Sequence, residues 1–498
     1  MDATTKGPVS PPGFRKLVER VLLAPVRAMK PAYLPLLMVY FAYGALGLVA
    51  VADSFWLRKE LTLSAAAMAQ LGVWLTLPWA MKMVFGELVD TIPVFGSQRR
   101  AYVFIGASLI ACGLLLLAGA AAKVITFTTP ERLYIAAQLL IVIGVVLQDV
   151  VADAMSTEVV PRTQADGSER AKADVDHDLG MVQILGRLAL SIGAFAVAGA
   201  GGWLASQLSY ASVFMIGLLI PVISASGAFL VRLESSESRP TDWRILGGGL
   251  AFGGVVALLA LAEIPFSQEL TFLVSLAVIL AMLKRITADI EMETKRRIAF
   301  AALIIFAFRA TPSVGEGFRW FAIDNLKFDE AFFGTLAQIG AGVALAAAWF
   351  LSDFITRKPV ATVLLWLTLI GGLLAIPTLM LVFGVHEWTE RMFGFGARTI
   401  AIIDAAASSP LVQLSMVPLL TLIAIYAPAN RRAIWFALMA SFLNLALIAG
   451  QLATKYLNIL FVVGRGSYAQ LPSLTVTVVV LGLVVPLAAI LAFGRRIR

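Results

Sequence analysis

The sequence predicts an all-α integral membrane protein, with two halves of six transmembrane helices each and a two-helix insertion between them. Three observations support this fold class. The 498 residues are 60% hydrophobic and only 14% charged, whereas soluble domains carry about 25% charged residues. Apolar stretches long enough to cross a bilayer recur along the whole chain. Two polar segments, 232–243 and 284–298, divide these stretches into groups of six, two and six.

We expect about 14 transmembrane helices, because a helix needs roughly 20 apolar residues to cross the hydrocarbon core. In chain order the apolar stretches lie near 32–51, 68–89, 101–122, 132–154, 180–204, 211–231, 243–262, 268–286, 298–323, 330–351, 359–383, 398–426, 433–462 and 472–493. The expected domains are a cytoplasmic segment at 1–31, a first half at 32–231, a linker with the helix hairpin at 232–297, and a second half at 298–498. Two six-helix halves are the plan of the major facilitator superfamily.

A weak internal repeat supports the idea of two related halves. Asp53 ends the first helix of the first half, and Asp90 ends the second. Asp324 and Asp353 hold the matching places in the second half. In both halves the second helix is rich in small residues and is followed by basic residues, so the acids match as well as the apolar stretches do.

The positive charges define the orientation. The formal net charge is +8, which could also suit a nucleic-acid partner. When the loops are assigned alternately to the two sides, however, most Lys and Arg residues gather on the side that holds both termini. The minority on the other side consists of Arg58, Lys59, Lys123, Arg132, Lys327, Arg391, Arg398 and Arg465. Both termini are therefore expected in the cytoplasm, and the chain is expected in the lipid of the inner (plasma) membrane, without a nucleic-acid partner.

The expected spans of the first half contain charged residues, among them Asp149, Asp153 and Arg187. Asp149 and Asp153 stand four residues apart and so share one helix face. Each charge at the bilayer centre costs about 3 kcal/mol, and two close carboxylates favour the uptake of a proton by one of them. Arg187 reaches a matching depth on the next helix. We predict that Asp149, Asp153 and Arg187 form a proton-coupling site; the alternative is a static clamp between two helices.

The second half contains a helix that its own sequence interrupts, FAFRATPSVGEGFRWF at 306–321. Pro312 removes a helix hydrogen bond, and broken helices at membrane depth often line a cavity. A guanidinium offers a planar fork for carboxylates, and an indole offers a flat apolar face. We predict a binding site for a flat anionic solute, made from Arg309, Glu316, Arg319, Trp320 and Asp404. The alternative is that Arg309 pairs with Asp404 and the aromatic side chains face lipid.

Five blocks of sequence carry a family resemblance. They are LPWAMKMVFGELVDTIPVFGSQRRAY, QDVVADAMSTEV, ATPSVGEGFRWFAIDNLKFDEAFFG, IAIIDAAASSPLVQLSMVPLLTL and FALMASFLN, which begin at residues 77, 148, 310, 400 and 436. In this order they resemble the folate-biopterin transporter family, a branch of the major facilitator superfamily. Two features depart from that family: PANRRAIW at 428–435 has arginines in place of an acid, and the helix hairpin exceeds the usual twelve helices. The departures affect substrate identity more than fold.

The resemblance implies a secondary active transporter that moves a small anionic solute, such as a folate or pterin, by alternating access and with protons. It also implies that the loop after the second helix latches the two halves on the cytoplasmic side. The expected cytoplasmic gate is made from Lys82, Glu87, Asp90, Arg99 and Arg100. A monomer is expected.

Several other functions are not supported by the sequence. His177 and His386, the two histidines, fall in expected loops without a second ligand nearby, and Cys112 is the single cysteine, so no metal site and no cofactor are expected. A phosphate-binding loop with its G-x-x-x-x-G-K pattern is absent, and we expect no enzyme. Two alternatives stay open: a membrane assembly factor or partner-binding protein of the same fold, and a carrier for another organic anion.

Overall fold

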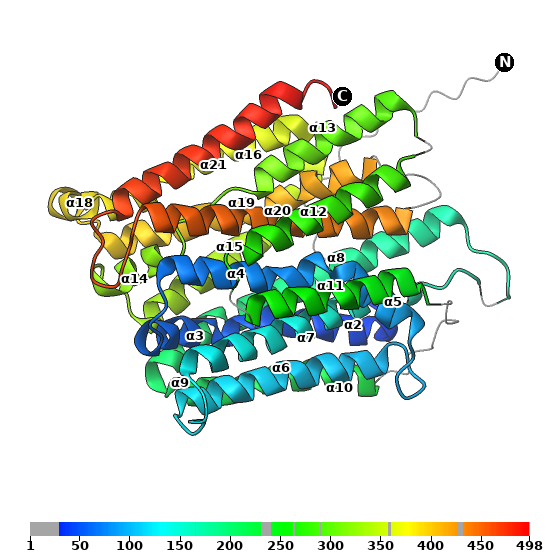
Figure 1. Ribbon diagram of the computed structural model, residues 1–498, viewed down its shortest axis with the longest axis horizontal. Coiled ribbons are helices and arrows are strands. Elements are labelled where there is room, and N and C mark those ends of the chain that lie inside the picture. Colours follow the sequence, from blue (N-terminus) through cyan, green and yellow to red (C-terminus); the bar gives the residue numbers. More distant parts are fainter. Residues whose placement is uncertain are drawn as a thin grey trace, which may run out of the picture.

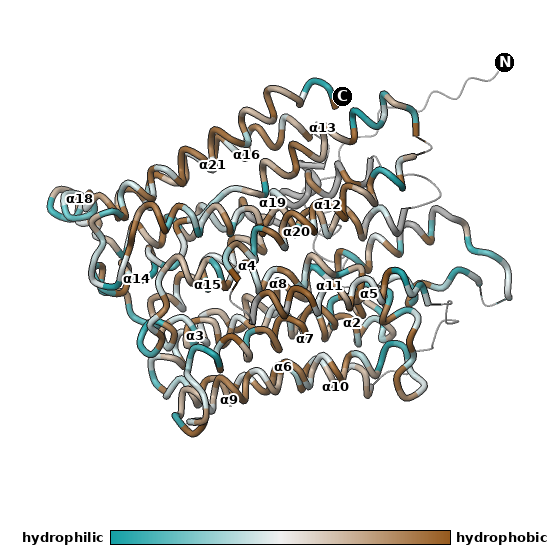
Figure 2. The backbone as a smooth tube through the Cα atoms, in the orientation of Figure 1, coloured by the Kyte–Doolittle hydropathy of each residue, from teal (hydrophilic) through white to brown (hydrophobic). Residues whose placement is uncertain are grey.

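The computed structural model describes residues 29–164, 166–230, 241–261, 264–288, 290–356, 360–425 and 432–497. Within these ranges, helices run side by side along one axis (Figure 1). Hydrophobic residues cover the middle of the bundle and hydrophilic residues gather at its two ends (Figure 2). Among the described residues, nine helices are long and apolar enough to cross a membrane. The all-α membrane fold is confirmed, whereas the total of about 14 crossings stays a prediction.

The first half consists of one short 3-10 helix and nine α-helices. Three of its expected spans are each divided in two, at Leu46, Met81 and Leu218. The elements are η1 (Pro31–Tyr33), α2 (Leu34–Ala45), α3 (Gly47–Glu60), α4 (Ala65–Ala80), α5 (Lys82–Thr91), α6 (Arg100–Ala121), α7 (Pro130–Glu158), α8 (Lys172–Gln207), α9 (Tyr210–Gly217) and α10 (Leu219–Leu230).

The hairpin and the second half follow the same style of construction. The hairpin consists of α11 (Trp243–Leu261) and α12 (Ser267–Ile286). The second half consists of α13 (Met292–Arg309), α14 (Glu316–Asp324), α15 (Glu330–Thr356), α16 (Val360–Leu374), α17 (Ile376–Val382), α18 (Val385–Phe393), α19 (Ala397–Ile425), α20 (Arg432–Leu460) and α21 (Leu471–Phe493). Of the expected cytoplasmic segment and linker, residues 1–28 and 231–240 lie outside the described residues, and so does the side chain of Asp353.

The predicted break at Pro312 is confirmed, because residues 310–315 separate α13 from α14. The sequence suggested that backbone groups freed by the break need water or a ligand as partners. Two of these groups instead have partners within the protein. The Ser313 N–H donates to Thr454 Oγ1 at 2.9 Å, and Asn458 Nδ2 donates to the Val314 carbonyl at 3.3 Å. Gly315 begins α14 with φ +76, a conformation in which a side chain would be strained. Side chains of α20 therefore support the break from within the protein.

The two halves meet along two helix pairs, α4 with α20 and α8 with α15. In the second pair, Gly202 and Gly334 let the backbones approach so closely that a Cβ atom on either would overlap the other helix. Small residues permit this close packing between membrane helices. The largest fully buried side chains include Trp56, Trp320 and Trp435. The seam between the halves is thus closely packed along these two helix pairs.

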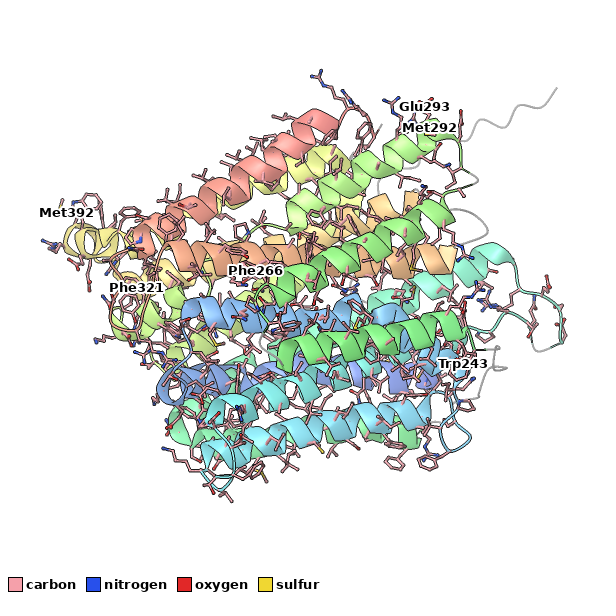
Figure 3. The ribbon with its side chains drawn as sticks, viewed as in Figure 1. Trp243, Phe266, Met292, Glu293, Phe321 and Met392 are labelled. Atoms are coloured by element: carbon pink, nitrogen blue, oxygen red, sulfur yellow. The ribbon has the colours of Figure 1, made fainter. Side chains whose placement is uncertain are left out.

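The hairpin covers one of these two helix pairs, α4 with α20. Helix α11 packs on α5 of the first half, and α12 packs on both α20 and α4. Gln268 Nε2 donates to the Gln70 carbonyl at 3.0 Å, while Lys455 Nζ lies 2.7 Å from Glu269 Oε1. Figure 3 shows Phe266 at the turn of the hairpin and Trp243 at the opposite end of α11. The start of α12 is therefore bonded to both halves at once.

Candidate functional site

A lysine lies between the two carboxylates that the sequence singled out on α7. Lys82 Nζ is 2.5 Å from Asp149 Oδ2 and 2.6 Å from Asp153 Oδ2. Tyr40 of α2 donates to Asp153 Oδ1 at 2.6 Å. Three elements, α2, α5 and α7, thus bring one ammonium group and two carboxylates together. The three charges sum to minus one, so one further proton would make the group neutral.

This arrangement corrects two sequence-based expectations. Arg187 was expected to contact the aspartates, but Lys82 does so, and Arg187 acts on the charge of Asp149 from further away. Lys82 was also grouped with the expected gate at the cytoplasmic rim. As the first residue of α5 it instead forms its ion pairs with Asp149 and Asp153 of α7. Its long, flexible side chain reaches α7, where two neighbouring carboxylates favour a cation between them.

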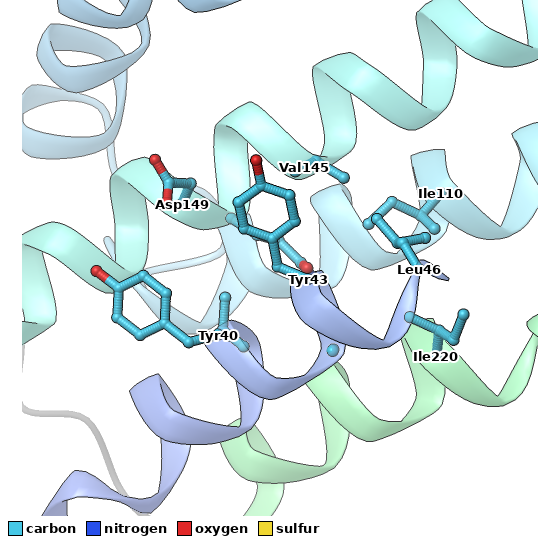
Figure 4. A pocket seen from close by; sticks show the side chains of 10 residues that line it. Tyr40, Tyr43, Leu46, Ile110, Val145, Asp149 and Ile220 are labelled. Carbon is cyan, nitrogen blue, oxygen red and sulfur yellow. The ribbon is translucent and has the colours of Figure 1, made fainter. Parts of the chain in front are cut away.

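A small pocket adjoins the carboxylates inside the first half. Figure 4 shows Asp149 beside the rings of Tyr40 and Tyr43, with apolar side chains further in. Its wall also includes Gln148, whose side-chain amide donates to the Val103 carbonyl and to Ser224 Oγ, both at 2.9 Å. The pocket lies between α2, α6, α7 and α10. Asp149 therefore faces a mostly apolar space that two phenol rings border.

The expected cytoplasmic gate divides into separate contacts. Arg99 is only 4% exposed and lies 2.5 Å from Glu158 and 2.9 Å from Asp90. Its Nη1 also donates to the Val89 carbonyl at 3.2 Å. This clamp ties the end of α5 to the end of α7, and all of its members belong to the first half. Glu158 was missed from the sequence, where it looked like one acid among several near a helix end.

The other two members of the expected gate lie apart from this clamp. Glu87 Oε1 accepts a hydrogen bond from the Asp242 N–H at 2.8 Å, just before the hairpin begins. The Arg100 guanidinium lies over the rings of Phe104 and Phe229, 5.7 and 5.2 Å from their centroids. Neither contact reaches the second half. The latch between the halves stays a prediction.

The candidate binding residues of the second half are also spread out. Arg309 ends α13, which packs on α20 and α21. Asp404 of α19 accepts hydrogen bonds from Thr378 Oγ1 at 3.1 Å and from Ser408 Oγ at 3.2 Å. Among the described residues, no ion pair joins Arg309 to Asp404. The structure therefore does not bring these two charges together as expected.

The remaining candidates lie at the end of the seam between the halves that the predicted topology places outside, which we call the outer end. Arg319 of α14 donates from Nη1 to Ser54 Oγ of α3. Trp320 is 1% exposed, and the Arg465 guanidinium lies over its ring at 4.9 Å. Trp320 thus packs in the protein instead of facing lipid or an open cavity. Arg319 and Trp320 belong to the contact between halves rather than to a group with Arg309.

Ion pairs that the sequence did not predict close this outer end. Arg58 Nη2 of α3 lies 2.6 Å from Asp324 Oδ2 of α14, and Tyr468 Oη donates to the same carboxylate. Lys59 Nζ lies 3.7 Å from Glu330 Oε1. The only signal in the sequence was that Asp53 and Asp324 occupy matching places in the internal repeat. The partners of each acid could not be identified without the folded chain.

Asp324 lies just outside the expected membrane span 298–323. The effects of its neighbours on the pKa of its carboxyl can therefore be compared without the lipid. Burial by itself would raise the pKa of this carboxyl. The hydrogen bonds from Tyr468 and Arg58, with the positive charge of Arg58, outweigh burial and hold the pKa below its usual range. The carboxylate is therefore ionised in this contact, and the outer ion pair is complete at neutral pH.

Comparisons with known proteins agree with this architecture. The model of the BT1 family matches residues 44–498. A folate-biopterin transporter of Synechocystis sp. is 28% identical over 454 residues, which are 90% of this chain and 80% of the relative. Folate transporter 1 of Plasmodium falciparum is 19% identical, over 84% of this chain and 71% of its own. The crystal structure of a POT family transporter in complex with 5-aminolevulinic acid superposes with a TM-score of 0.65 at 13% identity, covering 94% of this chain and 96% of that one.

Proposed function

The chain belongs to the BT1 family, and from this membership we propose that it moves a small anionic solute of the folate or pterin class across the membrane. It is a multi-pass membrane transporter with the major facilitator superfamily fold, and its named relatives are transporters rather than enzymes. We further propose that transport proceeds by alternating access and is coupled to protons. The supporting observations are the reversible contacts between the halves and the unbalanced charges of the Lys82 cluster.

Alternating access is supported by the nature of the outer closure. Arg58 and Asp324 belong to opposite halves, and both side chains are 22% exposed. Ion pairs that water can reach contribute only about 0–1 kcal/mol each, so a few of them can break and reform as the halves rock. We propose that the structure represents a state closed at the outer end.

Proton coupling is best supported by the Lys82 cluster, and this is the observation that carries the proposal. One ammonium group lies between the carboxylates of Asp149 and Asp153, at 2.5 and 2.6 Å. Because two carboxylates share one cation, a proton that arrives on Asp153 would release Lys82 from one of its two bonds. Arg187 would tune this equilibrium from a distance. In this scheme, proton binding changes how α5 is held against α7.

For the solute, we propose a site beside the interrupted helix. Arg309 stands at the last turn of α13, next to the break at residues 310–315. Its guanidinium can bind a carboxylate through two hydrogen bonds. Glu316, Arg319, Trp320 and Asp404 stay candidates for the same site in other conformations. We propose Arg309 as the strongest of the five, because it stands next to the helix break.

We propose the inner (plasma) membrane as the location, with the termini in the cytoplasm and the turn of the hairpin outside. Phe266 stands at this turn and is 70% exposed. With Cys112→Ser as background, Phe266→Cys should react with an impermeant maleimide added outside intact cells. Labelling only after the cells are opened would reverse the proposed topology. The same experiment needs no substrate.

The substrate class can be tested on the purified protein. A thermal-shift screen should include folates, pterins, and organic anions without a heteroaromatic ring. The proposal expects folates or pterins to raise the Tm in proportion to the logarithm of their concentration, as binding to the folded state requires. Shifts from the simple anions alone would point to another carrier activity. A complete lack of shifts, with no uptake in liposomes, would favour the assembly-factor alternative.

A further inference from the structure

A second acidic group lies at the seam, one layer inside the Arg58–Asp324 pair. Asp53 of α3 accepts hydrogen bonds from two side chains of α7, Tyr134 Oη at 3.2 Å and Gln138 Nε2 at 3.1 Å. Both donors are neutral, so they solvate the carboxylate without balancing its charge. The Lys82 cluster does not include this residue, and the sequence analysis assigned it only a place in the internal repeat. Asp53 is therefore an ionisable group still without a function.

The opposite half presents a second carboxylate to this region. Glu316 is the first residue of α14, and its Oε2 is buried without a hydrogen-bond donor among the described residues. Arg319 Nε lies 3.9 Å from that oxygen, too far for a hydrogen bond. Arg319 Nη1 meanwhile donates to Ser54, the neighbour of Asp53. The Arg319 guanidinium thus lies beside Glu316 and contacts the residue next to Asp53.

The charges of this group do not balance when the seam is closed. This part of the seam contains two carboxylates, one from each half, and the guanidinium of Arg319, which contacts Ser54 and lies 3.9 Å from Glu316. The other cations nearby are engaged further out: Arg58 with Asp324, Lys59 with Glu330, and Arg465 with the Leu57 carbonyl and the Trp320 ring. The remaining titratable neighbour, Tyr134, is a donor to Asp53. A buried carboxylate without a cation is costly, and a proton removes that cost.

We propose that Asp53 and Glu316 form a proton-binding site shared by the two halves, and that loading this site with one proton favours closure of the outer end. When the halves separate at this end, water can solvate both carboxylates and both can ionise. When the halves close, the pair retains one proton between its two members. The inference rests on the proposed function only in requiring that the outer end opens and closes.

This role differs from that of the Lys82 cluster. Lys82, Asp149 and Asp153 all belong to the first half, so their separation need not change when the halves rock. Asp53 and Glu316 belong to opposite halves, and their separation changes directly with closure. Proton binding at the seam is thus linked to the conformation itself, as differential affinity for two states requires.

The test measures conformation without any solute. In the Cys112→Ser background, spin labels at Val124 and Met392 report the outer separation of the halves; both residues are exposed, at 76% and 62%. Pulsed electron resonance gives the ratio of closed to open protein from pH 5 to 8. Linkage of one proton allows this ratio to rise by up to about tenfold for each pH unit lowered. Asp53→Asn should favour the closed state and reduce the pH dependence to less than about twofold.

Glu316→Gln removes the same charge from the other half and should give the same result, which keeps the test decisive if one variant does not fold. Asp329→Asn is the matched control, because Asp329 pairs with Arg398 within the second half, 3.0 Å away. It should leave the pH profile unchanged. A wild-type pH profile in both Asp53→Asn and Glu316→Gln would overturn the proposal. A profile that follows sodium concentration at constant pH would also overturn it, in favour of a cation site.

Failure of this inference can be separated from failure of the proposed function. If the labels report opening and closing without pH dependence, the seam site is wrong while alternating access stands. If the labels report one fixed separation under every condition, including saturating folate, alternating access itself is in question.

Discussion

At the scale of single residues, the folded chain gives the charged residues partners that the sequence did not predict. Asp149 and Asp153 could be identified because they stand four apart in an apolar helix. That Lys82 rather than Arg187 lies between them depends on where α5 begins relative to α7. Side-chain reach and helix interruption decide such pairings, and neither is encoded in spacing along one helix.

Arg309 carries the prediction on solute binding. A charge-assisted hydrogen bond contributes about 1.5–3 kcal/mol, so Arg309→Ala should weaken binding of the best ligand by roughly one to two decades. Arg309→Lys should recover only part of this loss, because the planar fork for a carboxylate is gone. Calorimetry on the purified variants provides the measurement. Unchanged affinity in Arg309→Ala would place the site elsewhere.

Asp324 carries the prediction on pH. Its pKa is held below its usual value. The ion pair of Asp324 with Arg58 therefore favours closure at any pH above the ordinary aspartate pKa of about 4. That contribution is lost only as the pH falls through the lowered pKa. Asp324→Asn should therefore loosen the outer end by a similar factor at pH 5.5 and at pH 8, about fivefold for roughly 1 kcal/mol.

The spin-label distances described above can measure this effect. The quantity to compare is the ratio of variant to wild type at each pH, which removes the pH dependence of the seam site. An effect of Asp324→Asn that vanished at pH 5.5 would mean that Asp324 is already protonated there, contrary to the account.

At the scale of elements, apolar length predicted the helices well, and Pro312 predicted the one break that the sequence analysis proposed. The interruptions at Leu46 and Leu218 have local signals that the sequence analysis did not use. Gly44 and Gly47 flank the first, and Gly217 and Pro221 flank the second. The partners of the backbone groups freed near Pro312 could not be predicted, because Thr454 and Asn458 come from a helix more than a hundred residues away.

The hairpin carries the prediction at this scale. Glu269 accepts from Lys455 Nζ and from Tyr456 Oη, both at 2.7 Å, and so fixes α12 to α20. Glu269→Gln keeps the size of the side chain but leaves the half-buried Lys455 without its carboxylate. We expect a loss of about 1–3 kcal/mol and a lower Tm.

A matched control uses a pair of the same type on the surface. Glu293 and Arg297 lie 2.7 Å apart with both side chains well exposed, so Glu293→Gln should leave the Tm unchanged. If Glu269→Gln matched wild type in thermal denaturation, the bond between α12 and α20 would contribute nothing to the fold.

At the scale of the whole molecule, composition and charge placement predicted the membrane fold and the grouping of its helices. Family membership and the superposition on a POT family transporter agree with that fold. The functional contacts were less predictable, because most of them join the two halves or the hairpin to a half. Arg58 and Asp324, for example, are separated by most of the first half and the hairpin in sequence. Only the folded arrangement makes them neighbours.

The central claim is that protons drive solute movement through the Lys82 cluster, and Asp153→Asn in liposomes tests it most directly. The substitution removes one of two carboxylates that share Lys82, so the cluster becomes neutral without a proton. The account predicts that the variant folds with a Tm close to that of wild type, still binds the solute and exchanges it across the membrane, but does not accumulate it when a pH gradient is imposed. Accumulation at the wild-type rate in Asp153→Asn would contradict the account.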